Sequence, residues 1–429
     1  MSEPFELTAT EGLKAIAAGR LTAEAWVASC LERIGEREPK VQAWEYLDRD
    51  GALARARELD KAGRGGLAAG VPFGVKDIID TADMPTAYGT PIHAGHRPGR
   101  DAGCVAITRA AGGVLLGKTV TTEFGHRYPG KTRNPFNPAH TPGGSSSGSA
   151  AAVGDKMIPL AYGTQTTGSV IRPAAFCGTV GYKPSFGDFN HNGVMPNSQT
   201  LDTLGAIVRS VEDLALVRSV LLEERPVPLT PPAMRDLRIG FYRSPFWERA
   251  EAYTRSYLED TARRLSAKGA KVADVDLPGI DAGFEKLFRT ISGFEFSRTV
   301  SWERINRPGA LSAVLRDGRM KDGMETTYAD YRQATRRLER MRLDMDGALA
   351  GYDALITPSA PGEPPQGLQT TGNAIFNSIW TALGTPAVTL PLFTGPSGLP
   401  VGLQLVAGRF NDRRLFNVAE AVRRDVGRV

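Results

Sequence analysis

Three stretches of the sequence contain the residue types that activate a serine as a nucleophile. Lys76 lies in the apolar run "VPFGVKDIID" at 71–80, and burial among apolar side chains lowers the pKa of a lysine, so that it can act as a base. Ser169 follows a Thr-Thr-Gly turn in "TQTTGSVIRPAAFCG" at 164–178, where backbone N–H groups can converge on an oxyanion. A hydroxyl group from residues 145–147 could relay a proton between the two. The chemistry that this set predicts is acyl transfer through a serine.

The stretch "TPGGSSSGSAAAV" at 141–153 has three competing interpretations. Its composition is typical of a flexible linker. A Walker A loop is excluded because no lysine follows the glycines. The segment "GSSSG" at 144–148 matches the nucleophile elbow G-x-S-x-G with Ser146 at its centre, but three prolines precede it in place of a strand. An elbow enzyme also needs a later histidine, and His191 is the only one after residue 148. We expect neither a linker nor an elbow.

The chain resembles the amidase signature family, whose hydrolases use a Ser–cis-Ser–Lys triad. The resemblance covers roughly residues 5–425 and is weaker over 225–350. It is carried, in order, by "GVPFGVKDIIDTADMPTAYGT", "DAGCVAITRAAGGVLLGKTVTTEF", "TPGGSSSGSAAAV", "TQTTGSVIRPAAFCGTVGYKPSFG", "TLDTLGAIVRS" and "GTPAVTLPLF…GLPVGLQLVAG". So many blocks in one order do not arise by chance.

The resemblance implies a role for each member of the triad. Ser169 is the nucleophile, Lys76 is the base, and Ser145, preceded by a cis peptide bond, carries the proton between them. The 24-residue spacing from Ser145 to Ser169 is that of the family. Ser146 and Ser147 are then neighbours of the site, and Ser147 stands where glycine is common. The resemblance also implies an oxyanion hole formed by the backbone N–H groups of Thr166, Thr167, Gly168 and Ser169.

Two residues near the nucleophile depart from the usual pattern of the family. Gln165 stands where an aspartate is common, and Arg172 lies three rather than two residues after Ser169. We expect both to contribute to substrate binding, with Arg172 holding a polar or carboxylate group through bidentate hydrogen bonds. The alternative is that Arg172 pairs with a neighbouring carboxylate. Because the usual glutamine-amidotransferase subunit carries the Asp/Arg version of this loop, the departure disfavours that function.

We expect the protein to be an amidase, a hydrolase that cleaves the C–N bond of amides other than peptide bonds. Acyl transfer of the same kind serves carbamates and aryl amides, so urethanase and aryl acylamidase activities fall within this prediction. The alternative is a glutaminase, an amidotransferase A-type subunit that feeds ammonia to a partner. The substrate is then a small-molecule amide or carbamate, and no cofactor is implied. A metal site is not expected either, since the loop of His93 and His96 contains no acidic residue or cysteine.

The substrate pocket is expected between segments that differ most from the family. These are 190–200, 285–335 and the late "NAIFNSIW" at 373–380. Aromatic residues in these segments could supply apolar walls, namely Phe288, Tyr328, Phe376 and Trp380.

The elements that must position these residues alternate between strand and helix. Short β-rich runs lie at 71–80, 112–120, 156–169, 236–244 and 271–278, followed by "YDALITPSAP" and a late pair of strands before a C-terminal helix. Such alternation predicts an α/β fold, a single large domain over 1–429 with a central mixed sheet covered by helices on both faces. Within it, 225–350 is a divergent, mostly helical region that shapes the substrate pocket. The Pro-rich 225–232 could begin a surface insertion.

Composition indicates an ordinary globular protein without a nucleic-acid or membrane partner. The chain has 429 residues, 41% of them hydrophobic and 23% charged, and its net charge of +5 is not concentrated in any run. Its three cysteines, Cys30, Cys104 and Cys177, have no CxxC spacing and do not indicate a disulfide framework. No apolar run approaches the ~18 residues of a membrane span, and the first residues do not read as a signal peptide. We expect a cytoplasmic monomer or homodimer.

Overall fold

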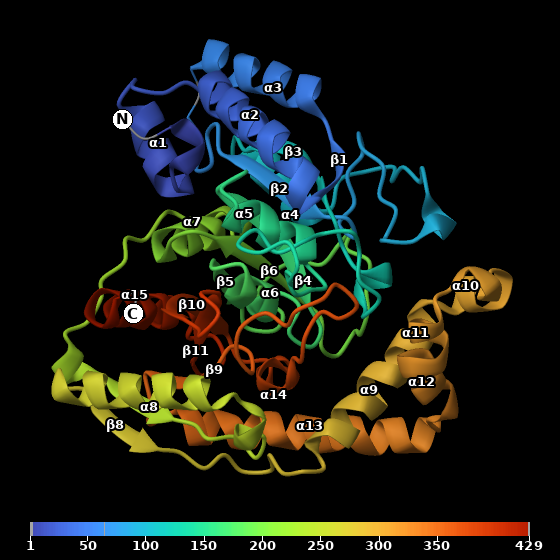
Figure 1. Cartoon of the computed structure of the whole chain (residues 1–429), viewed down its shortest axis with the longest axis vertical. Coiled ribbons are helices and arrows are strands. Elements are labelled where there is room, and N and C mark those ends of the chain that lie inside the picture. Colours follow the sequence, from blue (N-terminus) through green and yellow to red (C-terminus); the bar gives the residue numbers. More distant parts are fainter. Residues whose placement is uncertain (1–2, 64, 428–429) are drawn as a thin grey trace.

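Eleven strands form one mixed β-sheet in the order β1-β3-β2-β4-β6-β5-β10-β11-β9-β7-β8 (Figure 1). The structure is a computed structural model that describes residues 3–63 and 65–427. Residues 1–2 and 428–429 of the predicted domain therefore lie outside the described residues. Helices flank the sheet, and the predicted α/β class is confirmed.

The sheet combines two parallel groups with an antiparallel centre. In each group the middle strand runs parallel to both neighbours: β2 lies between β3 and β4, and β7 lies between β8 and β9. Antiparallel pairing joins β4, β6, β5, β10, β11 and β9 in that order. The strands are β1 Trp44–Leu47, β2 Pro72–Lys76, β3 Val114–Thr119, β4 Leu160–Gln165, β5 Val180–Lys183, β6 Thr203–Val208, β7 Arg238–Phe241, β8 Lys271–Asp274, β9 Ala354–Pro358, β10 Ala387–Thr394 and β11 Pro400–Val406.

Helices occupy most of the remaining chain. They are α1 Ala9–Ala17, α2 Ala23–Val41, α3 Arg49–Ala62, α4 Gly103–Ala110, α5 Ser147–Gly154, α6 Ile171–Phe176, α7 Val211–Leu221, α8 Ala252–Ala267, α9 Phe284–Thr299, α10 Ser301–Asn306, α11 Ala313–Leu315, α12 Lys321–Glu325, α13 Tyr328–Leu349, α14 Ile375–Leu383 and α15 Asp412–Val426. A π-helical turn, Arg316–Met320, joins α11 to α12. The first helix begins with a capping box: the Thr8 hydroxyl accepts from the Glu11 N–H, and the Glu11 carboxylate accepts from the Thr8 N–H.

Helices cover both faces of the sheet, as the alternation in β5 shows. Gly181 faces α6 so closely that a Cβ there would lie 2.5 Å from the Cβ of Ala174. The next residue, Tyr182, points to the opposite face, where its ring packs edge-on against Phe416 and its hydroxyl donates to Asp412, both in α15. Because successive residues of a strand point to opposite faces, α6 and α15 lie on opposite sides of the sheet.

Residues 225–350 contribute two strands as well as helices. The Pro-rich 225–232 leads from α7 toward β7, and α8 then connects β7 to the parallel β8, which gives a βαβ unit. Helices α9–α13 follow. In Figure 1, α13 runs along one side of the molecule, and α10, α11 and α12 lie at one end, away from the sheet.

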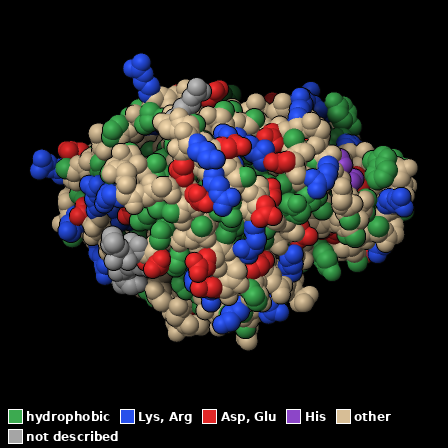
Figure 2. Space-filling model, turned by 90° about the horizontal axis from the view of Figure 1, so that it is seen from above, with side chains coloured by type: hydrophobic (Ala, Val, Ile, Leu, Met, Phe, Trp, Pro, Cys, Tyr) green, Lys and Arg blue, Asp and Glu red, His purple; other side chains and the backbone are tan. Residues whose placement is uncertain are grey.

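The surface carries no single-sign charge field on the face drawn in Figure 2. Basic and acidic side chains alternate over this face. Exposed ion pairs also occur at the surface, for example between Arg263 and Asp260 and between Arg337 and Asp281. Among the described residues, no helix is both long enough and apolar enough to cross a membrane.

Candidate active site

Lys76 lies at the end of β2, where every residue of the strand is buried. Its Nζ donates hydrogen bonds to Ser145 Oγ at 2.6 Å and to Thr164 Oγ1 at 2.9 Å. Burial lowers the pKa of Lys76 to about 7, and the negative charge of Asp202 opposes that shift. A substantial fraction of Lys76 is therefore neutral near pH 7 and able to accept a proton.

The loop before α5 brings Ser145 to the lysine through a tight turn. The peptide bond between Gly144 and Ser145 is cis. Gly143 has a φ of +80°, and a Cβ there would lie 2.8 Å from the Cα of Pro173, so only glycine fits this position. The loop therefore packs directly on the start of α6, close to the predicted nucleophile.

The other serines of the loop anchor it to the sheet. Ser146 Oγ accepts from the Thr164 N–H and donates to the Thr164 carbonyl, each at 3.3 Å. Ser147 Oγ donates to the carbonyl of Val120 at 3.3 Å. Ser146 is completely buried and faces the backbone of β4 rather than a cavity. These contacts rule out a flexible linker, and they give Ser146 an anchoring position rather than that of an elbow nucleophile.

Ser169 lies in the turn between β4 and α6 and lines a cavity of about 740 Å³. Its backbone carbonyl accepts a hydrogen bond from the Ser146 N–H at 3.3 Å, which ties the two serine loops together. Gly125 lines the same cavity beside the lysine: a Cβ there would lie 3.6 Å from Lys76 Nζ and 3.8 Å from Ser145 Oγ. Lys76 and Ser145 therefore lie beside Gly125 at the wall of the cavity that Ser169 also lines.

Four backbone donors are available beside Ser169. Within the described part of the chain, the N–H groups of residues 166–169 donate no hydrogen bond to other protein groups. The next two N–H groups, of Val170 and Ile171, both donate to Gln165 Oε1 at 3.0 Å. The run of free donors is the set expected for an oxyanion hole, and Thr166, Thr167 and Ser169 line the cavity.

Gln165 lies beneath this turn and is completely buried. While its Oε1 holds the start of α6, its Nε2 donates to Thr381 Oγ1 at 3.0 Å. Thr381 Oγ1 in turn donates to the carbonyl of Thr167 at 2.9 Å. An aspartate has no N–H to offer Thr381. These contacts support a role in positioning the oxyanion turn instead of the substrate contact expected from the sequence.

Arg172 lines the cavity and is only 6% exposed. One of its Nη atoms donates to the carbonyl of Gly144 at 2.6 Å and to Thr371 Oγ1 at 3.1 Å. No carboxylate of the described residues lies within ion-pair distance of Arg172, so the alternative of a structural ion pair is not seen. Its guanidinium therefore braces the peptide bond of Ser145 and still faces the cavity.

Parts of all three divergent segments line the cavity, namely Asn197, residues of 285–319 and residues of 373–378. Of the four aromatic residues expected as walls, only Phe288 lines it. Phe376 and Trp380 are buried in the core around α14, because every residue of this helix is buried. Tyr328 is 68% exposed at the start of α13. The prediction of apolar walls was therefore wrong for these three residues.

Thr164 and Asp202 are among the residues of the site that had not been predicted. Thr164 holds Lys76 from the neighbouring strand. Asp202 accepts from the Thr166 hydroxyl at 2.5 Å and from the Asn197 N–H at 2.6 Å. Burial raises the pKa of Asp202 to about 6. Their only signal in the sequence is that both lie in blocks that resemble the family, since neither stands in a recognisable spacing with Lys76.

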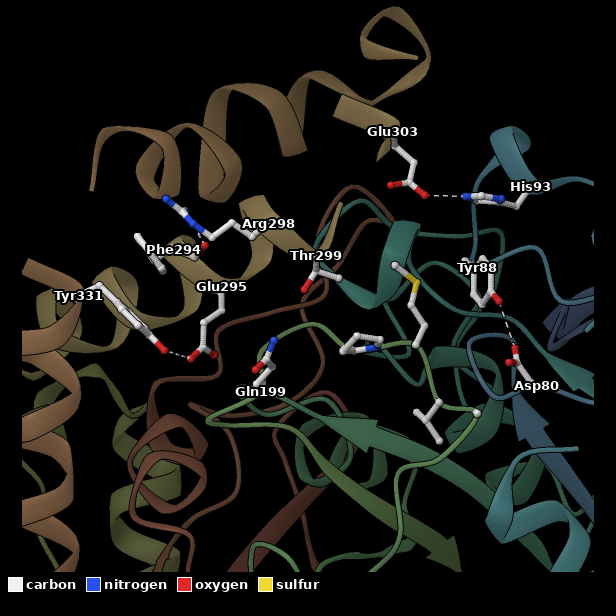
Figure 3. Close-up of a pocket in the computed structure, with 14 residues that line it drawn as sticks. Asp80, Tyr88, His93, Gln199, Phe294, Glu295, Arg298, Thr299, Glu303 and Tyr331 are labelled. Atoms are coloured by element: carbon white, nitrogen blue, oxygen red, sulfur yellow. Dashed lines mark hydrogen bonds and ion pairs between the residues drawn. The ribbon is translucent and has the colours of Figure 1, made fainter. Parts of the chain in front are cut away.

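A second cavity, of about 590 Å³, is lined by none of the three triad residues, and Figure 3 shows the side chains around it. Its polar groups are paired with one another: His93 with Glu303 at 2.7 Å, Tyr88 with Asp80 at 3.1 Å, and Tyr331 with Glu295 at 2.7 Å. Among the described residues, no group of three or more histidine, cysteine or acidic side chains is arranged to hold a metal ion.

The chain is similar to known proteins in both sequence and fold. The profile of the amidase family matches residues 25–416. The A-type subunit of a glutamyl-tRNA(Gln) amidotransferase from Chloroflexus aggregans is 32% identical, with 99% of this chain and 97% of the relative covered. The corresponding protein from Streptomyces coelicolor is 31% identical, with 98% and 96% covered. The first of these alignments spans 475 positions, more than the 429 residues of this chain, so that relative carries internal segments that are absent here.

Solved structures agree with the same fold. The peptide amidase from Stenotrophomonas maltophilia has a TM-score of 0.85 and 28% identity, with 99% of this chain and 98% of that chain covered. A chain from a vestigial protein complex that bears on the evolutionary origins of an s-triazine catabolic enzyme has a TM-score of 0.88 and 27% identity, with 99% of each chain covered.

Proposed function

The chain belongs to the amidase family, and from this premise we propose that it is an amidohydrolase that cleaves C–N bonds through an acyl-enzyme on Ser169. The observation that carries the proposal is the buried hydrogen bond of 2.6 Å between Lys76 and Ser145 beside the cavity that Ser169 lines. Serine acyl transfer needs three parts: a base of lowered pKa, a hydroxyl group that relays the proton, and a nucleophile beside backbone N–H groups that are free to donate.

The proposed reaction begins with neutral Lys76. Its Nζ accepts the proton of Ser145 Oγ while Ser145 takes the proton of Ser169. Ser169 Oγ bonds to the carbonyl carbon, and the oxyanion is held by backbone N–H groups of residues 166–169. The C–N bond then breaks as the proton returns through Ser145 to the leaving nitrogen. Water, deprotonated along the same path, hydrolyses the acyl-enzyme and releases the acid.

The range of substrates follows from what this reaction requires. It needs a carbonyl group with a nitrogen leaving group, so aryl amides and carbamates lie within the proposed range together with simple amides. The substrate is a small molecule that enters the cavity of about 740 Å³.

A second candidate is a glutaminase that acts as an amidotransferase A-type subunit. The names of the curated relatives favour it, and they align with nearly the whole chain. Two features distinguish this chain from such subunits. Its loop contains Gln165 and the shifted Arg172, and it lacks the internal segments that the relative from Chloroflexus aggregans carries.

The two candidates are separated by assaying the purified chain alone. A panel of primary amides, anilides, carbamates and glutamine is tested for release of ammonia or amine, with Ser169→Ala as the control. Hydrolysis of simple amides or anilides by the chain alone, lost in the Ser169→Ala variant, supports the first candidate. Release of ammonia from glutamine only when a partner protein is added supports the second. Equal turnover by wild type and the Ser169→Ala variant contradicts both.

A further inference from the structure

Three arginines that line the active-site cavity have no carboxylate partner. They are Arg127, Arg172 and Arg319, and among the described residues none of them forms an ion pair. A fourth cavity arginine, Arg289, is paired with Asp322 at 2.6 Å. Guanidinium groups remain charged in proteins, so the cavity holds an excess of positive charge.

Two of the unpaired arginines are more than nine-tenths buried. Arg172 is 6% exposed, and its Nε is a buried donor without a partner in the described structure. Arg319, in the π-helical turn, is 9% exposed, donates to the hydroxyl of Ser292, and lies over the ring of Phe288 at 5.8 Å from its centroid. Burying a charge without a counter-ion is costly, and a bound anion would supply the missing counter-ion.

The neighbouring positive charges repel one another. Burial, followed by the charge of Arg127, lowers the pKa of Arg172 to about 9. Burial and the charges of Arg127 and Arg289 lower the pKa of Arg319 to about 9 as well, and the nearby Asp322 opposes this shift. The pKa of His126 falls well below 6.5 through burial and the same positive groups, Arg319 and Arg127. His126 is therefore neutral at pH 7, and both arginines stay charged.

No carboxylate in the cavity is left to compensate this charge. Glu285 is the only acidic residue of the described structure that lines the cavity, and both of its oxygens accept from Arg249, at 3.0 and 2.6 Å. The buried Nδ1 of His126 adds a second polar atom without a partner in the described structure, on the same wall.

We propose that Arg172 and Arg319, with Arg127, form an anion subsite, and that the substrate is an amide that carries a carboxylate group. The inference rests on the proposed amidohydrolase function and names its substrate class. Arg172 lies three residues after Ser169 and is held by the carbonyl of Gly144, so the anion and the scissile bond share one cavity. Planar guanidinium groups suit a carboxylate through charge-assisted hydrogen bonds.

The same arrangement discriminates between two kinds of acidic amide. A zwitterionic amino acid such as glutamine brings an ammonium group, and no unpaired carboxylate of the described residues lines the cavity to receive it. A half-amide of a dicarboxylic acid brings only the negative charge. The subsite therefore selects the half-amide over glutamine.

Binding is tested on the Ser169→Ala variant, so that no turnover is required. Half-amides of dicarboxylic acids with two to five carbons are titrated by calorimetry, each beside its neutral methyl ester. We expect at least one acid to bind tenfold or more tightly than its ester, a preference typical of a charged hydrogen bond. If no acid binds more tightly than its ester, the subsite is refuted.

Charge variants locate the subsite. In the Ser169→Ala background, Arg319→Gln is expected to weaken binding of the preferred acid about 10-fold to 100-fold and to leave the ester unchanged. Arg127→Gln tests the same wall, and thermal melting checks that both variants are folded. Arg263→Gln, an exposed arginine on α8 paired with Asp260, is the matched control and should bind the acid as before. An equal loss for acid and ester would contradict the proposal.

Turnover separates the subsite from the proposed function. If the wild-type enzyme hydrolyses neutral amides and half-amides with the same kcat/KM, the amidohydrolase function is supported and the anion subsite is refuted. If acids bind the Ser169→Ala variant tightly but no amide is hydrolysed by the wild type, the subsite stands and the proposed function falls.

Discussion

Lys76 Nζ lies 2.6 Å from Ser145 Oγ and 2.9 Å from Thr164 Oγ1, and both partners are neutral hydroxyl groups. A neutral hydroxyl solvates an ammonium ion less well than a carboxylate does, so burial dominates and lowers the pKa of Lys76 to about 7. The proton on this nitrogen is therefore loosely held at neutral pH, and both activity and stability depend on it.

The first prediction concerns the pH dependence of kcat/KM. Because the neutral form of Lys76 is the base, kcat/KM should rise about tenfold per pH unit below pH 7 and level off above it. Steady-state kinetics between pH 5 and pH 9 on an uncharged amide measures this limb. An optimum on the acidic side would contradict a lysine base.

The second prediction concerns Asp202, whose negative charge raises the pKa of Lys76. Asp202→Asn keeps an oxygen acceptor for the Thr166 hydroxyl but removes the charge. The pKa of Lys76 should fall, and the rise of kcat/KM should move to lower pH by about half a unit or more. Asp260→Asn, an exposed carboxylate on α8, is the control and should leave the profile in place. A profile that does not move in the Asp202→Asn variant rules out this electrostatic coupling.

The third prediction separates three neighbouring serines. Ser169→Ala and Ser145→Ala should each reduce kcat to below about a hundredth of wild type, since each removes a member of the relay. Ser146→Ala should keep kcat within about tenfold of wild type. It should instead lower the free energy of unfolding by about 1–2 kcal/mol, because the backbone groups of Thr164 lose a partner. Abolished turnover in the Ser146→Ala variant alone would restore the elbow interpretation.

The fourth prediction concerns stability. The pKa of Lys76 is about 7 in the folded protein and 10.5 when unperturbed, so between these values the unfolded chain binds the extra proton. The contribution of Lys76 to the free energy of unfolding therefore rises with pH across this window, by up to about 1.4 kcal/mol per pH unit. Lys76→Met lacks this contribution. In urea titrations, the free energy of unfolding of the wild type should therefore rise relative to that of Lys76→Met from pH 7 to pH 10. A constant difference between the two proteins would contradict the lowered pKa of Lys76.

A second buried lysine, Lys183, does not disturb that comparison. Burial lowers its pKa to about 7 as well, and its Nζ donates only to the carbonyl of Pro184 among the described residues. Because Lys183 is present in both proteins, its titration cancels in the comparison of wild type with Lys76→Met.

Much of the fold was predictable because apolar periodicity marks most of the larger elements. The runs at 71–80, 112–120 and 156–169 became β2, β3 and β4, which hold the lysine and the turn of the nucleophile. Three short strands, β1, β5 and β6, had not been assigned as strands. β5 contains only the four residues "VGYK" and β6 begins "TLG", so each run is too short or too interrupted by glycine to identify a strand by itself. Their positions are fixed by pairing with β3, β4 and β10.

The parts of the site that depend on short motifs were predictable, whereas those that depend on contacts between residues far apart in the sequence were not. The placement of Lys76 beside Ser145 agrees with the resemblance. Gln165 was expected to contact substrate, but it lies beneath the turn because its amide finds Thr381, which is 216 residues away in the sequence. Arg319 lies in a region of weak resemblance, and nothing near it in the sequence indicates that it faces the cavity of Ser169. Long-range contacts of this kind carry no local signal.

The residues that support the turn of Ser169 also determine when, during synthesis of the chain, the enzyme can become active. Lys76, Ser145 and Ser169 are all synthesised before α7, whereas the residues that hold their loops, Thr371 and Thr381, emerge about 200 residues later. A ribosome-bound chain arrested before Thr371 therefore contains the whole triad but lacks the brace on Arg172 and the clamp on Gln165. We expect such nascent chains to show no turnover until the C-terminal strands dock. The enzyme would therefore be inactive during most of its own translation.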